Sequence, residues 1–299
     1  MRRGHPPGDL LGAHVSTQGG IGEAPARGVT IGATAIQVFT KTPNQWREPA
    51  LREPEVVRFH AALSASGIRA VVSHDSYLIN LASPDEALRE QSVQAFTSEL
   101  VRCRVLGIPW VVSHPGNYMD DRDAGLERNA RAYAQCLAAV PGEVRVLIEG
   151  TAGAGTALGS TFEELRALRD AMPAAARVRV GFCLDTAHLH AAGYDVVGAL
   201  EEAWERFDRE VGLPLLKCLH LNDSKGALGS HLDRHEWIGE GALGPEPFRR
   251  IMRDPRFAPV IKIIETPKGD DPVRYDRRML RRLRVYARNA HTTQTVGRA

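Results

Sequence analysis

The sequence contains few cysteines, no long apolar run and no strong excess of one charge. Its 299 residues include only four cysteines, and no two of them are spaced as C-x-x-C (Cys103, Cys136, Cys183, Cys218). Because each lies in an apolar segment, we expect free thiols in a reducing cytoplasm rather than a disulfide framework. No stretch approaches the roughly 20 apolar residues that span a bilayer, so no membrane partner is expected.

The formal charge of +2, from 38 basic and 36 acidic side chains, excludes a nucleic-acid coat protein that relies on overall positive charge. A local basic cleft stays possible. The N-terminal segment MRRGHPPGD has no apolar core behind it, which argues against a secretory signal. We expect residues 1–9 to be a flexible leader, residues 10–290 to form one domain, and residues 291–299 to be a flexible tail.

Eight short apolar runs rich in Val and Ile alternate with amphipathic segments. They predict strands at 11–14, 35–39, 70–73, 110–113, 145–149, 180–185, 216–221 and 260–265. Ser83-Pro84-Asp85-Glu86 and the pair Thr161 and Glu164 predict helix starts with capping boxes. This alternation favours an α/β fold, a (β/α)₈ TIM barrel. An open doubly wound sheet is the alternative, but G-x-G-x-x-G after the first strand and G-x-x-x-x-G-K-S/T are both missing.

Six consecutive predicted strands end in a residue that can bind a metal or transfer a proton. These residues are His74, His114, Glu149, Asp185, His220 and Glu265. In a barrel, parallel strands all end on one rim, so the six side chains should converge there. Carboxylates at the ends of buried strands are costly unless they are paired or metal-bound, and no lysine or arginine is placed to pair with them.

Two loop segments add further candidate ligands. His188 follows Asp185 by three positions, and Asp233 and His235 lie two apart. The complete set of five histidines and four carboxylates exceeds what one tetrahedral ion needs and suits two or three ions. Imidazole and carboxylate without thiolate favour zinc, with manganese or iron possible and magnesium disfavoured. Such a cluster keeps a net positive charge and should attract an anion such as a phosphodiester.

At this point several motifs match a known family. They are residues 12–16 (GAHVS), 39–41 (FTK), 74–80 (HDSYLIN), 114–116 (HPG), 185–188 (DTAH), 220–225 (HLNDSK), 233–235 (DRH) with 239–241 (GEG), and 264–266 (IET). In this order, from about residue 11 to 266, the chain resembles the endonuclease IV family of apurinic/apyrimidinic endonucleases. The resemblance implies a TIM barrel with three zinc ions at the C-terminal rim.

By motif match, the first ion would be held by His74, His114 and Glu149. The second would share Glu149 and add Asp185, His220 and Glu265. The third would be held by His188, Asp233 and His235. The catalytic centre would then be built on the carboxylates Glu149, Asp185 and Glu265.

The resemblance also implies the reaction and the partner. The family hydrolyses the DNA backbone 5′ to an abasic site, leaving a 3′-hydroxyl and a 5′-deoxyribose phosphate, and it trims blocked 3′ ends. Tyr77 and Leu78 match residues that enter the duplex at the lesion. Lys225 and Arg234, with Lys41, are candidates for phosphate contacts. The partner would be lesion-bearing double-stranded DNA, bound by a monomer.

Two positions depart from the family pattern. Gly150 stands where the family has asparagine, and Asn44 stands where it can have a DNA-inserting arginine. His14 ends a strand but is not one of the nine ligands, so it is expected to support a ligand or the fold. The alternative function is that of a metal-dependent sugar isomerase or epimerase on a related barrel. Such an enzyme has no use for the third ligand set, which therefore favours the nuclease.

Overall fold

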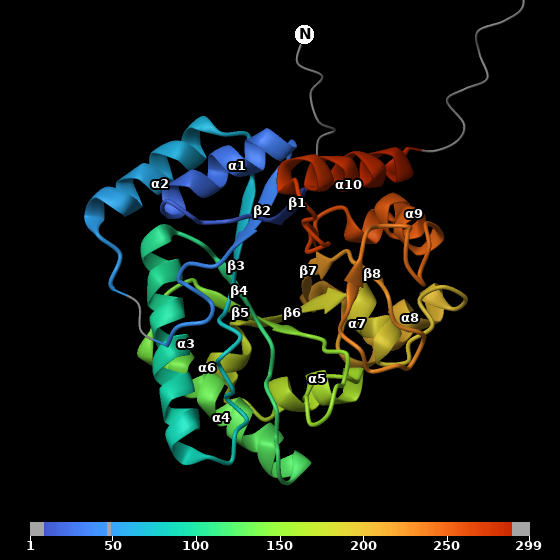
Figure 1. Ribbon diagram of the computed structural model, residues 1–299. Helices are drawn as coiled ribbons and strands as arrows, with labels where there is room; N and C mark the ends of the chain where they lie inside the picture. The colour runs from blue at the N-terminus through green and yellow to red at the C-terminus, as the bar shows by residue number, and fades with distance from the viewer. Residues whose placement is uncertain (1–8, 47–48, 289–299) are drawn as a thin grey trace, which may run out of the picture.

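Eight parallel strands close into a barrel in the computed structural model, which describes residues 9–46 and 49–288 (Figure 1). Around the barrel the strand order is β1-β10-β7-β6-β5-β4-β3-β2. Their bounds are β1 Leu11–His14, β2 Ala35–Val38, β3 Ala70–His74, β4 Trp110–Ser113, β5 Arg145–Glu149, β6 Val180–Asp185, β7 Leu216–His220 and β10 Ile261–Ile264. The closed barrel confirms the predicted fold and excludes the open sheet.

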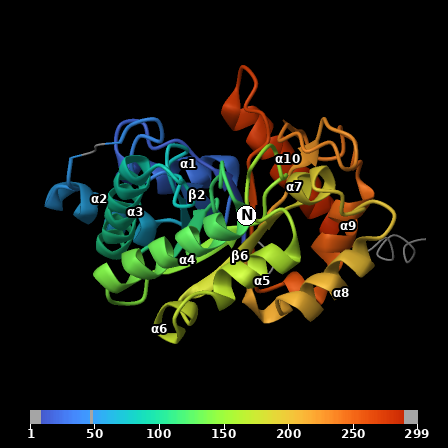
Figure 2. The same ribbon diagram turned by 90° about the horizontal axis from the view of Figure 1, so that it is seen from below.

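Helices surround the strands as a continuous outer layer (Figure 1). They are α1 Ala24–Ile31, α2 Glu53–Ala65, α3 Glu86–Leu106, α4 Arg122–Ala139, α5 Phe162–Asp170, α6 Ala174–Arg177, α7 Thr186–Ala191, α8 Leu200–Glu210, α9 Glu246–Arg253 and α10 Pro272–Ala287. Short 3₁₀ turns lie at η1 Ile21–Glu23, η2 Leu213–Leu215 and η3 Pro255–Phe257. In Figure 2, α6 lies at the lower edge and α7 higher, so β6, which joins them, runs upward toward the rim of the site.

The strands are apolar on both faces because both faces are buried. Their outward side chains pack against the helices in the main core. Their inward side chains form a second, smaller cluster inside the barrel, made of Ala35, Val72, Val112, Leu147, Cys183, Cys218, Ile261 and Ile263. All four cysteines are free and buried, as expected. The barrel interior is therefore a packed floor on which the rim residues stand.

Local capping explains where the helices begin. Thr161 caps α5, with its hydroxyl accepting from Glu164 N at 3.2 Å, which confirms the predicted helix start. The Glu164 carboxylate accepts from Gly159 N and Ser160 N rather than from Thr161 N, so the reciprocal bond of the predicted capping box is wrong. The predicted start at Ser83 is wrong, because Asp85 is the N-cap of α3 and accepts from Leu88 N. The Ser83 hydroxyl instead accepts from Asp85 N, so it orders the turn before the helix.

Four further features complete the description of the fold. The expected leader, apart from Asp9, and the expected tail lie outside the described residues. Asp9 forms an ion pair with Arg284 of α10 at 3.0 Å. A small antiparallel pair that the sequence analysis did not foresee, β8 Asp223–Ser224 and β9 His235–Glu236, lies above the rim. Among the described residues, no helix is long and apolar enough to cross a membrane.

Candidate metal centre

Glu149, at the end of β5, lies at the centre of the cluster of strand-end residues. It is fully buried. Its Oε2 lies 3.2 Å from His74 Nε2 and 3.2 Å from His114 Nε2, while its Oε1 lies 2.9 Å from His220 Nδ1. Strands β3, β4 and β7 thus bring three predicted ligands to one carboxylate on β5. This geometry suits a carboxylate that bridges two ions.

A second group forms on the other side of Glu149. His220 Nδ1 lies 3.2 Å from Glu265 Oε2 and 4.0 Å from Asp185 Oδ2. One ligand atom from each of these residues and from Glu149 falls within 4.8 Å of the others. Three buried carboxylates this close together repel one another, and burying them costs free energy unless a cation balances their charge. The donor set is that of a divalent ion site.

The loop ligands form a third group. His188 Nε2 and His235 Nε2 lie 3.4 Å and 3.2 Å from the same atom, Asp233 Oδ1. Both ring nitrogens are buried without a hydrogen-bond partner. Buried polar atoms are normally satisfied, and two orphaned nitrogens aimed at one carboxylate fit a coordination site. The antiparallel pair β8 and β9 holds this loop over the rim, so the predicted third set does meet in space.

The histidine rings are oriented by backbone carbonyls on their far side. His74 Nδ1 lies 2.9 Å from Asp75 O, and His188 Nδ1 lies 2.9 Å from Gly150 O. These bonds leave each Nε2 facing the cluster, which is the usual arrangement behind metal-binding histidines. The departure at Gly150 does not alter the bond, because the backbone makes it.

Asp185 is oriented by both of its oxygens. Its Oδ1 accepts from Ala187 N and His188 N and so caps α7. Its Oδ2 accepts from Asn222 Nδ2 at 2.6 Å and faces the cluster. Asn222 also accepts from Glu265 N at 2.8 Å, so this one fully buried amide ties two ligand strands together. The sequence analysis quoted Asn222 only as part of a motif and assigned it no role.

Mutual contact shifts the pKa values of the cluster strongly. Burial alone would lower the pKa of His74, but its hydrogen bond to Glu149 and the charge of that carboxylate outweigh burial and raise it to about 9. Burial also lowers the pKa of His188, but Asp185 and Asp233 outweigh burial and raise that pKa to about 10. At Glu149, burial is outweighed by His220 and His114, which hold its pKa well below the ordinary value. In the metal-free centre, protonated histidines balance the carboxylates, and metal ions would displace those protons on binding.

One buried polar residue of this centre, Gln37, is not among the residues predicted from the sequence. Gln37 on β2 is fully buried and contacts Glu265, His220 and His14. The available signal was a single glutamine inside the apolar run 35–38, on the same strand face as Ala35. His14 lies 3.6 Å from Glu265 and faces Phe39, which agrees with its expected supporting position.

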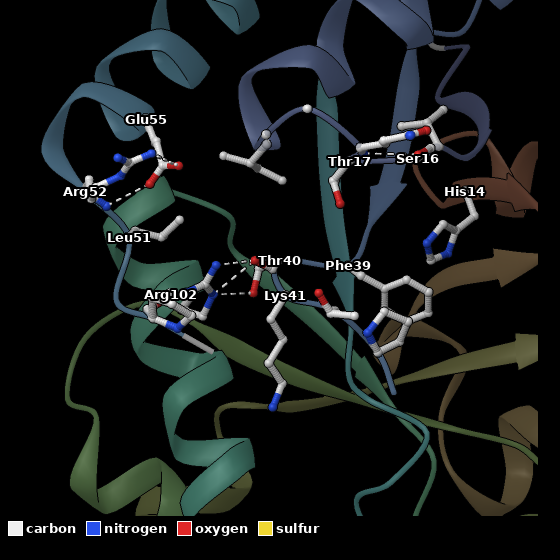
Figure 3. A pocket seen from close by; sticks show the side chains of 18 of the residues that line it. His14, Ser16, Thr17, Phe39, Thr40, Lys41, Leu51, Arg52, Glu55 and Arg102 are labelled. Carbon is white, nitrogen blue, oxygen red and sulfur yellow. Dashed lines mark hydrogen bonds and ion pairs between the residues drawn. The ribbon is translucent and has the colours of Figure 1, made fainter. Parts of the chain in front are cut away.

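Two adjoining cavities open on the rim. The metal pocket, about 290 Å³, is lined by His74, Tyr77, His114, His188, Asp233, His235 and Glu265, together with His14, Phe39 and Lys268. The side groove, about 920 Å³, shares His14, Phe39 and Lys268 with it. Figure 3 shows this groove running from His14 to the loop that Arg102 holds through Thr40 O at 3.0 Å. These three shared residues make the groove and the metal pocket contiguous.

The predicted DNA-contact residues are spread around these openings. Tyr77 is 66% exposed at the metal pocket, with its ring 5.3 Å from that of Phe39. Leu78 beside it is half-buried, and Asn44 is exposed on the loop after β2. Lys225 and Arg234 are exposed in the loop that joins β8 to β9, where Lys225 lies 3.8 Å from Glu236.

Comparison with known proteins agrees with this geometry. Residues 26–283 match the family model described as xylose isomerase-like TIM barrel. A protein of Geotalea daltonii named probable endonuclease 4 is 47% identical over 267 residues, covering 88% of this chain and 93% of its own. The chain belongs to the endonuclease IV family.

Solved structures support the same placement. The crystal structure of endonuclease IV from Thermus thermophilus superposes with a TM-score of 0.82 at 35% identity, covering 93% of this chain and 98% of that one. A putative xylose isomerase from Rhodospirillum rubrum superposes with a TM-score of 0.70 at 13% identity, over 92% and 99% of the two chains. The second likeness shows the shared barrel alone.

Proposed function

We propose that this endonuclease IV family member hydrolyses the DNA backbone on the 5′ side of abasic sites. The products would be a 3′-hydroxyl and a 5′-deoxyribose phosphate, and blocked 3′ ends would be trimmed by the same centre. The observation that carries the proposal is the convergence of all nine ligand candidates into three contacting groups on one rim. The Geotalea relative, named probable endonuclease 4, and the Thermus structure, named endonuclease IV, support the same activity.

The three groups would hold three zinc ions, with manganese or iron possible in one of them. The first two groups offer imidazole nitrogens and carboxylate oxygens, and in the third His188 and His235 lie within 4.8 Å of Asp185 and pair with Asp233. The buried thiols of Cys183 and Cys218 also lie within 4.8 Å of a His220 nitrogen, below the second group. The first would use His74, His114 and Glu149. The second would share Glu149 with Asp185, His220 and Glu265, and the third would use His188, Asp233 and His235. Ions there would acidify a bound water and stabilise the attacking and leaving oxygens of a phosphoryl transfer.

The chain's own groups would orient the reaction. Glu149, Asp185 and Glu265 are the proposed catalytic carboxylates, because they meet in one ligand group and Glu265 lines the metal pocket. The pocket closes on one side with the exposed ring of Tyr77. Tyr77 and Leu78 would fill the gap in a duplex whose abasic nucleotide has turned toward the ions. Asn44 would contact the duplex where the family can insert an arginine, and Lys225 and Arg234 would contact the flanking backbone.

The proposed partner is double-stranded DNA with an abasic or 3′-blocked lesion, bound in the cytoplasm by a monomer. The proposed catalytic domain is residues 10–290. A sugar isomerase or epimerase is the alternative function. It draws support only from the barrel shared with distant isomerases, and the third ligand group has no place in it.

The test is a labelled duplex with one abasic analogue, incubated with the purified protein with and without chelator. We expect metal-dependent cleavage 5′ to the lesion and a 3′ end that a polymerase extends. A second duplex with a blocked 3′ end tests trimming. A folded protein with verified metal content that leaves both substrates intact would refute the proposal, and sugar isomerisation assays would follow.

A further inference from the structure

Gln37 is a buried amide at the floor of the metal centre. It lies on β2 and is fully buried, and strand alternation puts it on the inner face with Ala35. An amide in such a place is costly unless its polar atoms are hydrogen-bonded. Its three partners, His14, His220 and Glu265, are all at the metal centre.

The orientation of this amide is fixed by Glu265. The Gln37 side-chain nitrogen, Nε2, lies 2.6 Å from Glu265 Oε1 and 3.0 Å from His14 Nδ1. A carboxylate only accepts hydrogen bonds, so the amide nitrogen and not the amide oxygen must face it. The two amide hydrogens are therefore donated to Glu265 and to His14.

The amide oxygen consequently faces His220. Gln37 Oε1 lies 2.8 Å from His220 Nε2. A carbonyl oxygen only accepts, so His220 must carry a hydrogen on Nε2. In a neutral imidazole the lone pair is then on Nδ1, which lies 2.9 Å from Glu149 Oε1 and 3.2 Å from Glu265 Oε2. The lone pair points into the second ligand group.

We propose that Gln37 is a positioning residue for the ion held by Glu149, Asp185, His220 and Glu265. It selects the His220 tautomer that binds through Nδ1, and it holds Glu265 by Oε1 so that Oε2 faces the ion. The inference rests on the proposed function, because it takes this ligand group as an ion site. Groups that orient metal ligands in this way typically change metal affinity about 10–100-fold when removed.

The test compares Gln37→Leu with Thr34→Val. Leucine keeps most of the side-chain volume but can neither donate nor accept. Thr34 is 2% exposed just before β2, at the end of the barrel away from the rim, and its hydroxyl contacts Leu11 N at 3.0 Å. The control therefore also loses a buried hydrogen bond next to the same strand without touching the metal centre.

Zinc content by mass spectrometry and zinc affinity by competition with a chromophoric chelator are measured without DNA. We expect Gln37→Leu to bind one ion about 10–100-fold more weakly and to keep the others. Thr34→Val should show wild-type affinities. Melting of both metal-free variants shows whether each still folds. Wild-type affinity for every ion in folded Gln37→Leu would overturn the inference.

A spectroscopic readout tests the tautomer directly. Long-range proton–nitrogen correlations on zinc-loaded protein labelled at histidine should show one ring with its hydrogen on Nε2 and zinc on Nδ1, altered in Gln37→Leu. Absence of such a ring would overturn the inference. A wild-type protein that shows this ring and binds its ions, but does not cut abasic DNA, would refute the proposed function and leave the role of Gln37 standing.

Discussion

Replacing Glu265 by glutamine should separate the metal chemistry from the fold. Glu265 follows β10 and presents Oε1 to Gln37 Nε2 at 2.6 Å and Oε2 to His220 Nδ1 at 3.2 Å. In Glu265→Gln the new amide oxygen can accept from Gln37, and the new amide nitrogen can take the place of Oε2. His220 keeps the carboxylate of Glu149 at 2.9 Å. Without metal, nearby negative groups including Glu149 and Glu265 hold the pKa of His220 well above its ordinary value, so the substitution removes one charge-assisted contact. The metal-free fold should lose about 1.5–3 kcal/mol.

The effect on turnover should be larger. An amide nitrogen facing His220 Nδ1 donates to the lone pair that the ion needs, and one negative charge leaves the ligand group. Removing a single preorganised electrostatic contact at a reacting centre costs about 10²–10³ in kcat, or about 3–4 kcal/mol. We therefore expect a loss of that size on an abasic duplex, accompanied by weaker binding of one ion.

The assay pairs single-turnover cleavage of a duplex carrying an abasic analogue with metal analysis and thermal melting. Glu164→Gln is the matched control, because Glu164 is also buried but accepts from Gly159 N and Ser160 N before α5 and pairs with Arg122 at 2.5 Å, outside the ligand set. The control should melt at a lower temperature and keep its turnover. Wild-type turnover and metal content in Glu265→Gln would refute the reasoning, and so would failure of its metal-free form to fold.

Four further outcomes are expected. Chelation should abolish cleavage and added zinc should restore it, whereas full activity after verified metal removal would exclude a metal mechanism. In the metal-free protein, contact with carboxylates raises the pKa of His74 and His235 to about 9 and that of His188 to about 10. A raised histidine pKa stabilises the fold below the ordinary value of 6.5, and this contribution disappears as pH rises through 9 to 10. The melting temperature should therefore fall between pH 7 and 10, and a flat profile would contradict these contacts. Trp237, next to β9, is half-buried, and its indole stacks on the ring of Tyr275 with 4.8 Å between the ring centroids. Trp237→Ala should therefore lower the free energy of unfolding by roughly 2 kcal/mol and weaken binding of the third ion. Unchanged zinc content would disprove this coupling. Tyr77→Ala should weaken binding of abasic duplex about tenfold in a titration. Because the ring is 66% exposed, the free energy of unfolding should stay within about 0.5 kcal/mol of the wild-type value. Unaltered affinity would remove Tyr77 from the proposed DNA contacts.

The sequence determined the barrel and most of its site because both depend on local pattern. Short Val- and Ile-rich runs that alternate with helical segments predict buried parallel strands, and the structure has strands at all eight places. Parallel strands of a barrel end on one rim, so a ligand at a strand end is placed without knowledge of any contact. This is why Glu149 and Asp185 could be assigned to a common cluster from their position alone.

Only the tertiary structure decided how these ligands are held. Gln37 and Glu265 are 228 positions apart and meet because β2 and β10 both flank β1 in the closed barrel. Asn222 joins Asp185 to the backbone of Glu265 by a similar long-range route. A single glutamine in an apolar strand carries no sign of its partners, since hydrogen-bond direction depends on which atoms face each other. Residue type fixes which atoms can bind an ion, and only packing fixes which atom of each residue is presented to it.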